Sequence, residues 1–275
     1  MNSIKDATNT YIEGCKGKVA ATFSTTFVKA IMAGFMIALG AAGSNVAAHA
    51  VTNVGLSRTI AGCVFPMGLM MVIFMGAELF TGDCMAAMAT ITGKINVAQT
   101  IKLLVIVYIG NFVGGALMAY MAFVAGQWNY SSNLLGAYTI KVALGKATIS
   151  FPAGISSGIL CNILVCAAVI MALCAKEAAG KLLVSFFIIL LFVTSGYEHC
   201  VANMYYITAG LIAKTNPAYV QAAEEVYGIT AESLANLNVY NFLVSNLIPV
   251  TIGNILGGMV FVGLPLAKMY GNKEN

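Results

Sequence analysis

The 275-residue chain is 60% hydrophobic and 9% charged, with a mean hydropathy of +0.88. No soluble domain of this size has that balance, so the composition predicts a polytopic helical membrane protein with no room for a separate catalytic domain. The net charge of +4 is unremarkable, and we expect no nucleic-acid partner. Seven cysteines, mostly within apolar stretches and without a C-x-x-C pair, predict free buried thiols, with no disulfide framework, metal or cofactor.

Apolar residues recur at roughly helical spacing through residues 1–25, which predicts a cytoplasmic amphipathic helix at the membrane interface; a frayed polar tail is the alternative. Six apolar segments follow, each longer than the ~20 residues that cross a bilayer. They cover residues 28–50, 59–91, 102–126, 148–174, 182–212 and 239–269. The second and fifth segments are overlong, and polar residues interrupt them at 76–82 and 195–199.

The distribution of basic residues predicts the orientation in the membrane. With the N-terminus inside, ten Lys residues fall on the inner side, and four basic residues fall on the outer side: Arg58, Lys141, Lys146 and Lys214. This excess follows the positive-inside rule, so we expect both termini in the cytoplasm.

Three features recur in the two halves of the chain: Ala33-Gly34 with Ala153-Gly154, Gly76-x-Glu78 with Gly196-x-Glu198, and the stretch 110–115 with 253–258. The first two pairs are 120 residues apart and the third is 143 apart, because the second half has a longer outer loop near 214–238. Each half, 26–126 and 146–270, has three spans, so the halves must be inverted relative to each other. Inverted repeats with broken helices at matching positions are typical of channels and transporters. We therefore expect a single all-α transmembrane channel domain over residues 1–275.

The two interruptions predict a cavity for a small anion. Backbone groups freed inside a bilayer are tolerated only where protein or water satisfies them, and the N-terminus of a half-helix carries a partial positive charge. Glu78 and Glu198 are interpreted as acceptors that bond the freed N–H groups and point away from the lumen. A cation-binding or proton-relay pair is the alternative interpretation.

His199 lies within the second interruption, next to Glu198. A lone histidine on an apolar face is usually a satisfied core residue, but ionisable groups within membrane spans are functional by default. Its near-neutral titration would let it donate a proton or a hydrogen bond to an anion, and Thr81 at the other break would supply a hydroxyl. From its position alone, Lys146 is interpreted as a snorkelling interfacial lysine.

An intramembrane serine protease is the alternative from another functional class. Residues 154–158 match G-x-S-x-G, in which Ser156 would be the nucleophile and His199 its base. Small residues at this spacing more often mark close helix packing, and motif matches alone carry a high false-positive risk. We therefore expect that the chain is not an enzyme.

Three motifs closely resemble the formate/nitrite transporter family: G-A-E-L-F-T at 76–81, G-Y-E-H-C-V-A-N-M at 196–204, and N-L-I-P-V-T-I-G-N-I-L-G-G at 246–258. The resemblance covers all six spans and implies an aquaporin-like fold, assembled as a homopentamer in the bilayer of the cytoplasmic membrane with one pore per protomer. It also implies that the N-terminal helix can gate the pore. The positions that it implies are His199, Thr81, Asn162 and Asn254 at the pore centre, Lys146 in the vestibule, Leu69, Leu79 and Phe80 at the cytoplasmic constriction, and Phe65, Phe192 and Val165 at the outer one.

The chain departs from the family pattern at Asp83, an acid that closely follows Thr81. This departure leaves formate, nitrite and hydrosulfide open as substrates, with formate preferred. All three are conjugate bases of weak acids, and a bare anion pays a large penalty in an apolar ring. The hypothesis is that Lys146 concentrates the anion, that His199 protonates it or holds it between the constrictions, and that the neutral acid passes, by passive or proton-coupled transport. Chloride should pass poorly.

Overall fold

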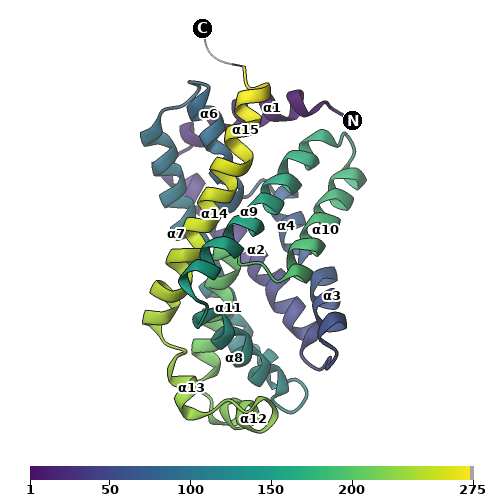
Figure 1. Cartoon of the computed structure of the whole chain (residues 1–275), viewed down its shortest axis with the longest axis vertical. Helices are drawn as coiled ribbons and strands as arrows, with labels where there is room; N and C mark the ends of the chain where they lie inside the picture. Colours follow the sequence, from purple (N-terminus) through teal and green to yellow (C-terminus); the bar gives the residue numbers. More distant parts are fainter. Residues whose placement is uncertain (273–275) are drawn as a thin grey trace.

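The computed structural model describes residues 1–272, which form helices joined by short turns and, within that range, no strands (Figure 1). In chain order the helices are α1 (Ile4–Ala20), α2 (Phe23–Ala48), α3 (Val54–Val64), α4 (Pro66–Phe74), α5 (Phe80–Asp83), η1 (Cys84–Ala86), α6 (Ala87–Ile91), α7 (Val97–Val124), η2 (Gln127–Asn129), α8 (Leu134–Ala147), α9 (Phe151–Cys174), α10 (Ala178–Ser195), α11 (Cys200–Ala213), α12 (Pro217–Tyr227), α13 (Ala231–Ala235), η3 (Asn241–Leu247), α14 (Ile248–Leu256), η4 (Gly257–Gly263) and α15 (Leu264–Tyr270).

Six helical stretches among residues 1–272 are long and apolar enough to cross a membrane, which confirms the six predicted spans. They are Phe23–Ala48, Val54–Phe74, Val97–Val124, Phe151–Cys174, Ala178–Ser195 and Asn241–Tyr270. The sixth runs through η3, α14, η4 and α15, of which η3 and η4 are π-helical. The second and fifth end at their interruptions, so the rest of each predicted segment forms a separate half-helix: α5 to α6 in the first half and α11 in the second.

Both interruptions are built in the same way. Gly76 and Gly196 follow the ends of α4 and α10 with φ of +60° and +74°, a left-handed conformation that favours glycine. Three residues later, Leu79 and His199 take an extended conformation as the N-caps of α5 and α11. The 120-residue spacing of these two breaks is therefore a structural equivalence.

Asn111 of α7 bridges the first interruption to α2. Its Nδ2 donates to the carbonyl oxygens of Ala30 at 2.7 Å and Glu78 at 3.0 Å, and its Oδ1 accepts from the Phe80 N–H at 2.9 Å. One amide side chain thus satisfies backbone groups on both sides of the break, which a bilayer would leave without partners.

Asn254 of α14 bridges the second interruption to α9 in the same way. Its Nδ2 donates to the carbonyl oxygens of Gly158 at 2.8 Å and Glu198 at 3.0 Å, and its Oδ1 accepts from the Cys200 N–H at 2.9 Å. The same three bonds at the same places in both halves establish how the repeats correspond.

The equivalence corrects the register predicted for the first and fourth spans. The carbonyl bonded by Asn111 is that of Ala30 and the one bonded by Asn254 is that of Gly158, so these spans are related by 128 residues. The predicted match of 33–34 with 153–154, at a spacing of 120, was wrong. Both spans contain many small residues, so a single Ala-Gly match does not define a register.

The helix α1 and the end of α15 lie at one end of the bundle, called here the terminal end, and α12 and α13 lie at the opposite loop end (Figure 1). A capping box between Ser3 and Asp6 starts α1. Its buried face consists of Ala7, Thr8, Tyr11, Ile12 and Cys15. This face packs on the bundle, against α6, α9 and α15. The predicted helix is thus present, and protein covers its apolar side.

Residues 134–147 form α8, which the sequence pattern did not predict. This helix packs against α11 and α12, and the aromatic ring of Tyr219 fills the space beside Gly136. At 14 residues α8 is too short to cross a bilayer, so it gives no span signal. It carries Lys146 in its last turn.

Candidate functional site

The two interruptions meet in the middle of the bundle. Thr81 in α5 and His199 at the start of α11 are both buried, and Thr81 Oγ1 lies 3.0 Å from His199 Nε2. These two residues come from opposite halves and were both predicted at the centre of a pore. The imidazole packs within the protein, as that prediction requires.

The second nitrogen of His199 defines the tautomer of its ring. The backbone N–H of Ala202 donates to His199 Nδ1 at 3.0 Å, so Nδ1 presents a lone pair. In a neutral imidazole the proton then resides on Nε2, which donates to Thr81 Oγ1. The structure therefore presents a neutral histidine whose Nε2–H, together with the Thr81 hydroxyl, provides hydrogen-bond donors at the centre of the bundle.

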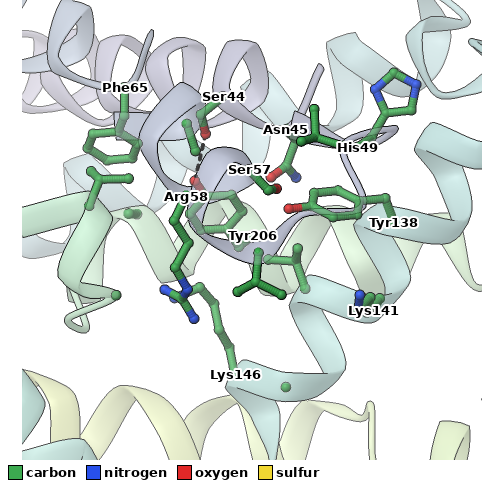
Figure 2. A pocket seen from close by; sticks show the side chains of 18 of the residues that line it. Ser44, Asn45, His49, Ser57, Arg58, Phe65, Tyr138, Lys141, Lys146 and Tyr206 are labelled. Atoms are coloured by element: carbon green, nitrogen blue, oxygen red, sulfur yellow. Dashed lines mark hydrogen bonds between the residues drawn. The ribbon is translucent and has the colours of Figure 1, made fainter. Parts of the chain in front are cut away.

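A cavity of about 750 Å³ is lined by residues near the loop end, such as His49 and Tyr227, and reaches His199. We call it the loop-side cavity, and Figure 2 shows part of its lining. Its charged lining residues are Arg58, Lys141, Lys146 and Glu198. At its inner end Phe65 and Phe192 form an edge-to-face pair with ring centroids 5.7 Å apart, and the Phe192 ring lies 6.0 Å from the His199 ring. Both residues belong to the predicted outer constriction, whose role stays a prediction.

A second cavity of about 230 Å³ opens toward the terminal end. We call it the terminus-side cavity. Leu69 and Leu79, which were predicted at the cytoplasmic constriction, line it together with Tyr11, Lys18 and Asp83. The two cavities share no described lining residue: Phe65, Phe192 and His199 line the first, and Leu69 and Leu79 line the second.

Phe80 and Val165, the remaining predicted constriction residues, are buried but are not among the described lining residues of either cavity. The Phe80 ring packs edge-on against Tyr108, with centroids 4.8 Å apart. In this conformation Phe80 therefore anchors α5 to α7.

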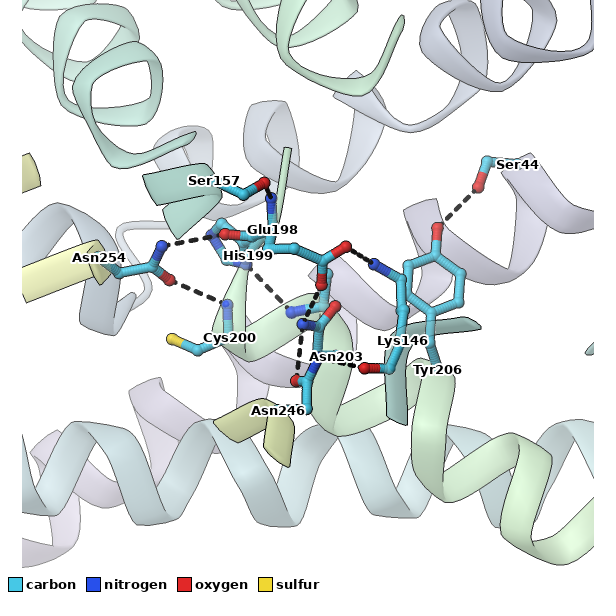
Figure 3. A network of polar contacts seen from close by, with 11 residues as sticks. Ser44, Lys146, Ser157, Glu198, His199, Cys200, Asn203, Tyr206, Asn246 and Asn254 are labelled. Atoms are coloured by element: carbon cyan, nitrogen blue, oxygen red, sulfur yellow. Dashed lines mark hydrogen bonds and ion pairs between the residues drawn. The ribbon is translucent and has the colours of Figure 1, made fainter. Parts of the chain in front are cut away.

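Lys146 lines the loop-side cavity within a closed polar network (Figure 3). Its ammonium group lies 2.9 Å from Glu198 Oε1 and 5.2 Å from the centroid of the Tyr206 ring. Asn203 donates to Glu198 Oε2 at 2.6 Å and to Asn246 Oδ1 at 2.9 Å, and Asn246 donates back to the Lys146 carbonyl at 2.9 Å. The interpretation of Lys146 as a snorkelling lysine was wrong, because its charge is paired inside the protein.

The predicted bonds of Glu78 and Glu198 also require correction. Glu198 pairs with Lys146, and Glu78 Oε2 lies 2.5 Å from Lys18 Nζ. The freed N–H groups of Phe80 and Cys200 instead donate to asparagine side chains. An amide both donates and accepts, so it can satisfy the N–H and the C=O groups of a break, whereas an ionised carboxylate only accepts.

Asn162 and Asn254, both predicted at the pore centre, support the interruptions. Asn162 Nδ2 donates to the Thr81 carbonyl at 3.1 Å and to the Asn254 carbonyl at 2.6 Å. Asn162 therefore joins the backbone that carries Thr81 to the α14 segment that holds the second break. Both amides are fully buried, and neither is among the described lining residues of the two cavities.

The terminal end contains an ion cluster that sequence patterns did not reveal. Lys18 Nζ lies 2.5 Å from both Glu78 Oε2 and Asp83 Oδ1, and the Tyr11 hydroxyl donates to the Gly82 carbonyl at 2.8 Å. Asp83, noted in the sequence as a departure, is thus the partner of a lysine 65 positions earlier. Its position next to the break was the only sequence signal.

All seven cysteines are unpaired. Among residues 1–272, no group of three or more His, Cys, Asp or Glu side chains is arranged to hold a metal ion.

Comparison with known proteins assigns the family. The profile of the formate/nitrite transporter family matches residues 5–268. The chain belongs to the formate/nitrite transporter family. The formate channel FocA of Haemophilus influenzae is 38% identical over 212 residues, which are 76% of this chain and 73% of FocA. A probable formate transporter of Methanothermobacter thermautotrophicus is 32% identical over 263 residues, 89% of this chain and 88% of that protein.

Solved structures extend the similarity to three dimensions. A pentameric formate channel with formate bound matches with a TM-score of 0.80 at 30% identity, covering 90% of this chain and 97% of that chain. The all-α fold with six spans is therefore that of the formate/nitrite transporter family. The two interruptions, the Thr81–His199 pair and both cavities lie within the matched residues.

Proposed function

We propose that this chain transports formate across the membrane as a homopentamer, with one pore in each protomer. The relatives named formate channels and the similar pentameric structure with formate bound support this proposal. These names favour formate over nitrite and hydrosulfide, the alternatives within the family. We also propose that residues 1–275 act as a single channel domain.

One observation carries the proposal. A buried donor pair, Thr81 and His199, lies between an aromatic pair and two leucines, with cavities opening toward opposite ends of the bundle. An anion that moves from one cavity to the other must pass these apolar side chains, and the hydrogen-bond donors that lie between them are Thr81 and His199. That arrangement suits a transported anion better than a permanently bound one.

The proposed mechanism follows from the cost of moving charge through apolar surroundings. Lys146 and the other cations of the loop-side cavity attract formate to its mouth. At the centre, His199 Nε2–H and the Thr81 hydroxyl turn from each other to bind the anion. An isolated carboxylate would pay many kcal/mol in apolar surroundings, so we propose that formate crosses them as formic acid.

The neutral tautomer of His199 limits its part in this proton transfer. An imidazolium would carry a proton on Nδ1, which would then oppose the Ala202 N–H that now donates to it. We therefore propose that His199 holds the anion as a hydrogen-bond donor while a hydronium ion, which arrives through the water of the loop-side cavity, gives it a proton and leaves a water molecule.

The cytoplasmic membrane is the proposed location, with both termini in the cytoplasm, because basic residues are concentrated at the terminal end.

Apolar side chains recur every fourth position along the exposed face of α7, which suits contact with lipid or with a neighbouring protomer. They are Val97, Ile101, Val105, Ile109, Val113 and Leu117.

Formate uptake into proteoliposomes, measured across a pH series, tests the role of His199. His199→Ala removes a hydrogen bond to a charged substrate, so we expect uptake to fall about 10-fold or more and its pH profile to change. Ser156→Ala on the exposed face of α9 is the matched control and should transport like wild type. Uptake by His199→Ala that matches wild type in rate and pH profile would overturn the proposed role.

The same control tests the protease alternative. Both ring nitrogens of His199 are occupied, by Thr81 and Ala202, and residues 154–158 lie within the uninterrupted helix α9. The strand-to-helix turn that exposes such a serine nucleophile is thus replaced by regular helix. Labelling by a fluorophosphonate probe that Ser156→Ala abolishes would support the protease over the channel.

A further inference from the structure

Arg58 is the only arginine in the sequence, and its side chain lines the loop-side cavity (Figure 2). Its guanidinium lies directly against the backbone of Gly196, such that a Cβ atom on Gly196 would overlap Nη1 and stand 3.1 Å from Cζ. The glycine that ends α10 therefore also leaves the space in which the guanidinium rests. Its counterpart Gly76 has open space around the same position, so this contact exists in one half only.

The helix α3 places Arg58 on the same face as Phe65, which lies nearer the centre of the bundle. Arg58, Gly62 and Phe65 are spaced i, i+4 and i+7, so they share one helix face. Gly62 lets this face approach the α10 backbone, because a Cβ there would lie 3.1 Å from the Leu190 carbonyl. Phe65 belongs to the aromatic constriction, about 10 Å further along the helix at 1.5 Å per residue. An anion bound by Arg58 would thus lie on the loop side of that constriction, about 10 Å from it.

The charge of Arg58 is available to a ligand. The lining of the loop-side cavity contains three cations, one carboxylate and two histidines, and the carboxylate of Glu198 is paired with Lys146. Lys141 lies over the ring of Tyr227, 4.3 Å from its centroid. Arg58 is exposed, and among residues 1–272 no acidic partner contacts it.

We propose that Arg58 selects two-oxygen anions at the mouth of the pore. A guanidinium presents two parallel N–H donors that match the two oxygens of formate or nitrite, whereas an ammonium is a point charge. Hydrosulfide has a single acceptor atom and gains no second bond from the fork. The inference deepens the proposed function and rests on it, because it assigns the discrimination among its candidate substrates to one side chain.

Uptake kinetics of formate, nitrite and hydrosulfide in proteoliposomes test the inference, with Arg58→Lys as the variant. The substitution keeps the charge and removes the fork, so the KM for formate and for nitrite should rise about tenfold while that for hydrosulfide stays within about twofold. Lys141→Gln is the control, since it removes a cation from the same cavity; it should shift the three KM values by a common factor.

The outcomes distinguish a failure of the Arg58 proposal from a failure of the proposed formate transport. An equal rise of all three KM values in Arg58→Lys, or no rise, would overturn the selective role of Arg58. Hydrosulfide uptake at the wild-type rate shows that the variant is folded and assembled. Wild-type vesicles that take up hydrosulfide but no formate would refute the proposed formate transport itself, independently of any variant.

Discussion

The docking of α1 on the bundle depends on Lys18, and Lys18→Gln measures that dependence. The side chains of its partners Glu78 and Asp83 are 7% and 2% exposed, while that of Lys18 is 26% exposed. Removing one partner of a fully buried pair costs about 3–5 kcal/mol. With Lys18 partly exposed to solvent, we discount this to about 2 kcal/mol. At about 1.4 kcal/mol per factor of ten, release of α1 should become about 30-fold more favourable.

Alkylation of Cys15 reports the release of α1. Cys15 lies on the buried face of α1, and burial raises the pKa of its thiol to about 12, so it should react only when the helix leaves the bundle. In a background where the more exposed Cys63 and Cys174 are serine, Lys18→Gln should raise the rate of maleimide labelling about 30-fold. The control is Lys5→Gln, an exposed position on the same helix, which should change the rate less than about twofold.

Equal labelling of the two variants would refute this reasoning and would show that the apolar face alone holds α1. The pH dependence is a second check. Burial lowers the pKa of Lys18, but attraction to Asp83 and Glu78 outweighs this and raises it above the ordinary 10.5. The charge of Lys18 is thus fully present below pH 10.5 and is lost only as the pH rises through the folded pKa. The ratio of labelling rates should therefore stay constant from about pH 8 to 9, where both carboxylate partners are ionised.

Substitutions of Asn254, Gly76 and Gly196 test the support of the interruptions, with Asn45→Leu as a control. Asn254→Leu leaves two carbonyls and one N–H of the second break without their partner, so thermal unfolding in detergent should show stability reduced by about 3 kcal/mol or more. The control Asn45→Leu removes an amide whose buried Nδ2 has no partner, so it should lose less stability. Equal losses in the two variants would contradict the role of Asn254 at the break. Ala at Gly76 or Gly196 should cost about 1–2 kcal/mol for the left-handed backbone, and only Gly196→Ala should also raise the KM for formate, because it displaces Arg58. A similar KM in the two glycine variants would contradict that contact.

Much of the candidate site followed from the sequence because the bilayer constrains it strongly. Long apolar segments and the need to satisfy backbone groups in lipid predict six spans and mark two of them as broken. An imidazole within such a break predicts a buried functional group, and the structure pairs it with Thr81 of the other break. The spacing of the two breaks was also correct, since Gly76 and Gly196 are both required for the left-handed turn.

The sequence alone determined which segments cross the membrane and where they break, because hydrophobicity and backbone conformation are local properties of the chain. Only the tertiary structure decided which polar side chain serves each break. Asn111 and Asn254 reach the freed backbone groups from another helix, while Glu78 and Glu198 form ion pairs with lysines. The place of Arg58 over Gly196 was decided in the same way. Such contacts depend on the packing of segments far apart in the chain, and neither periodicity nor motif spacing encodes a distance between two helices.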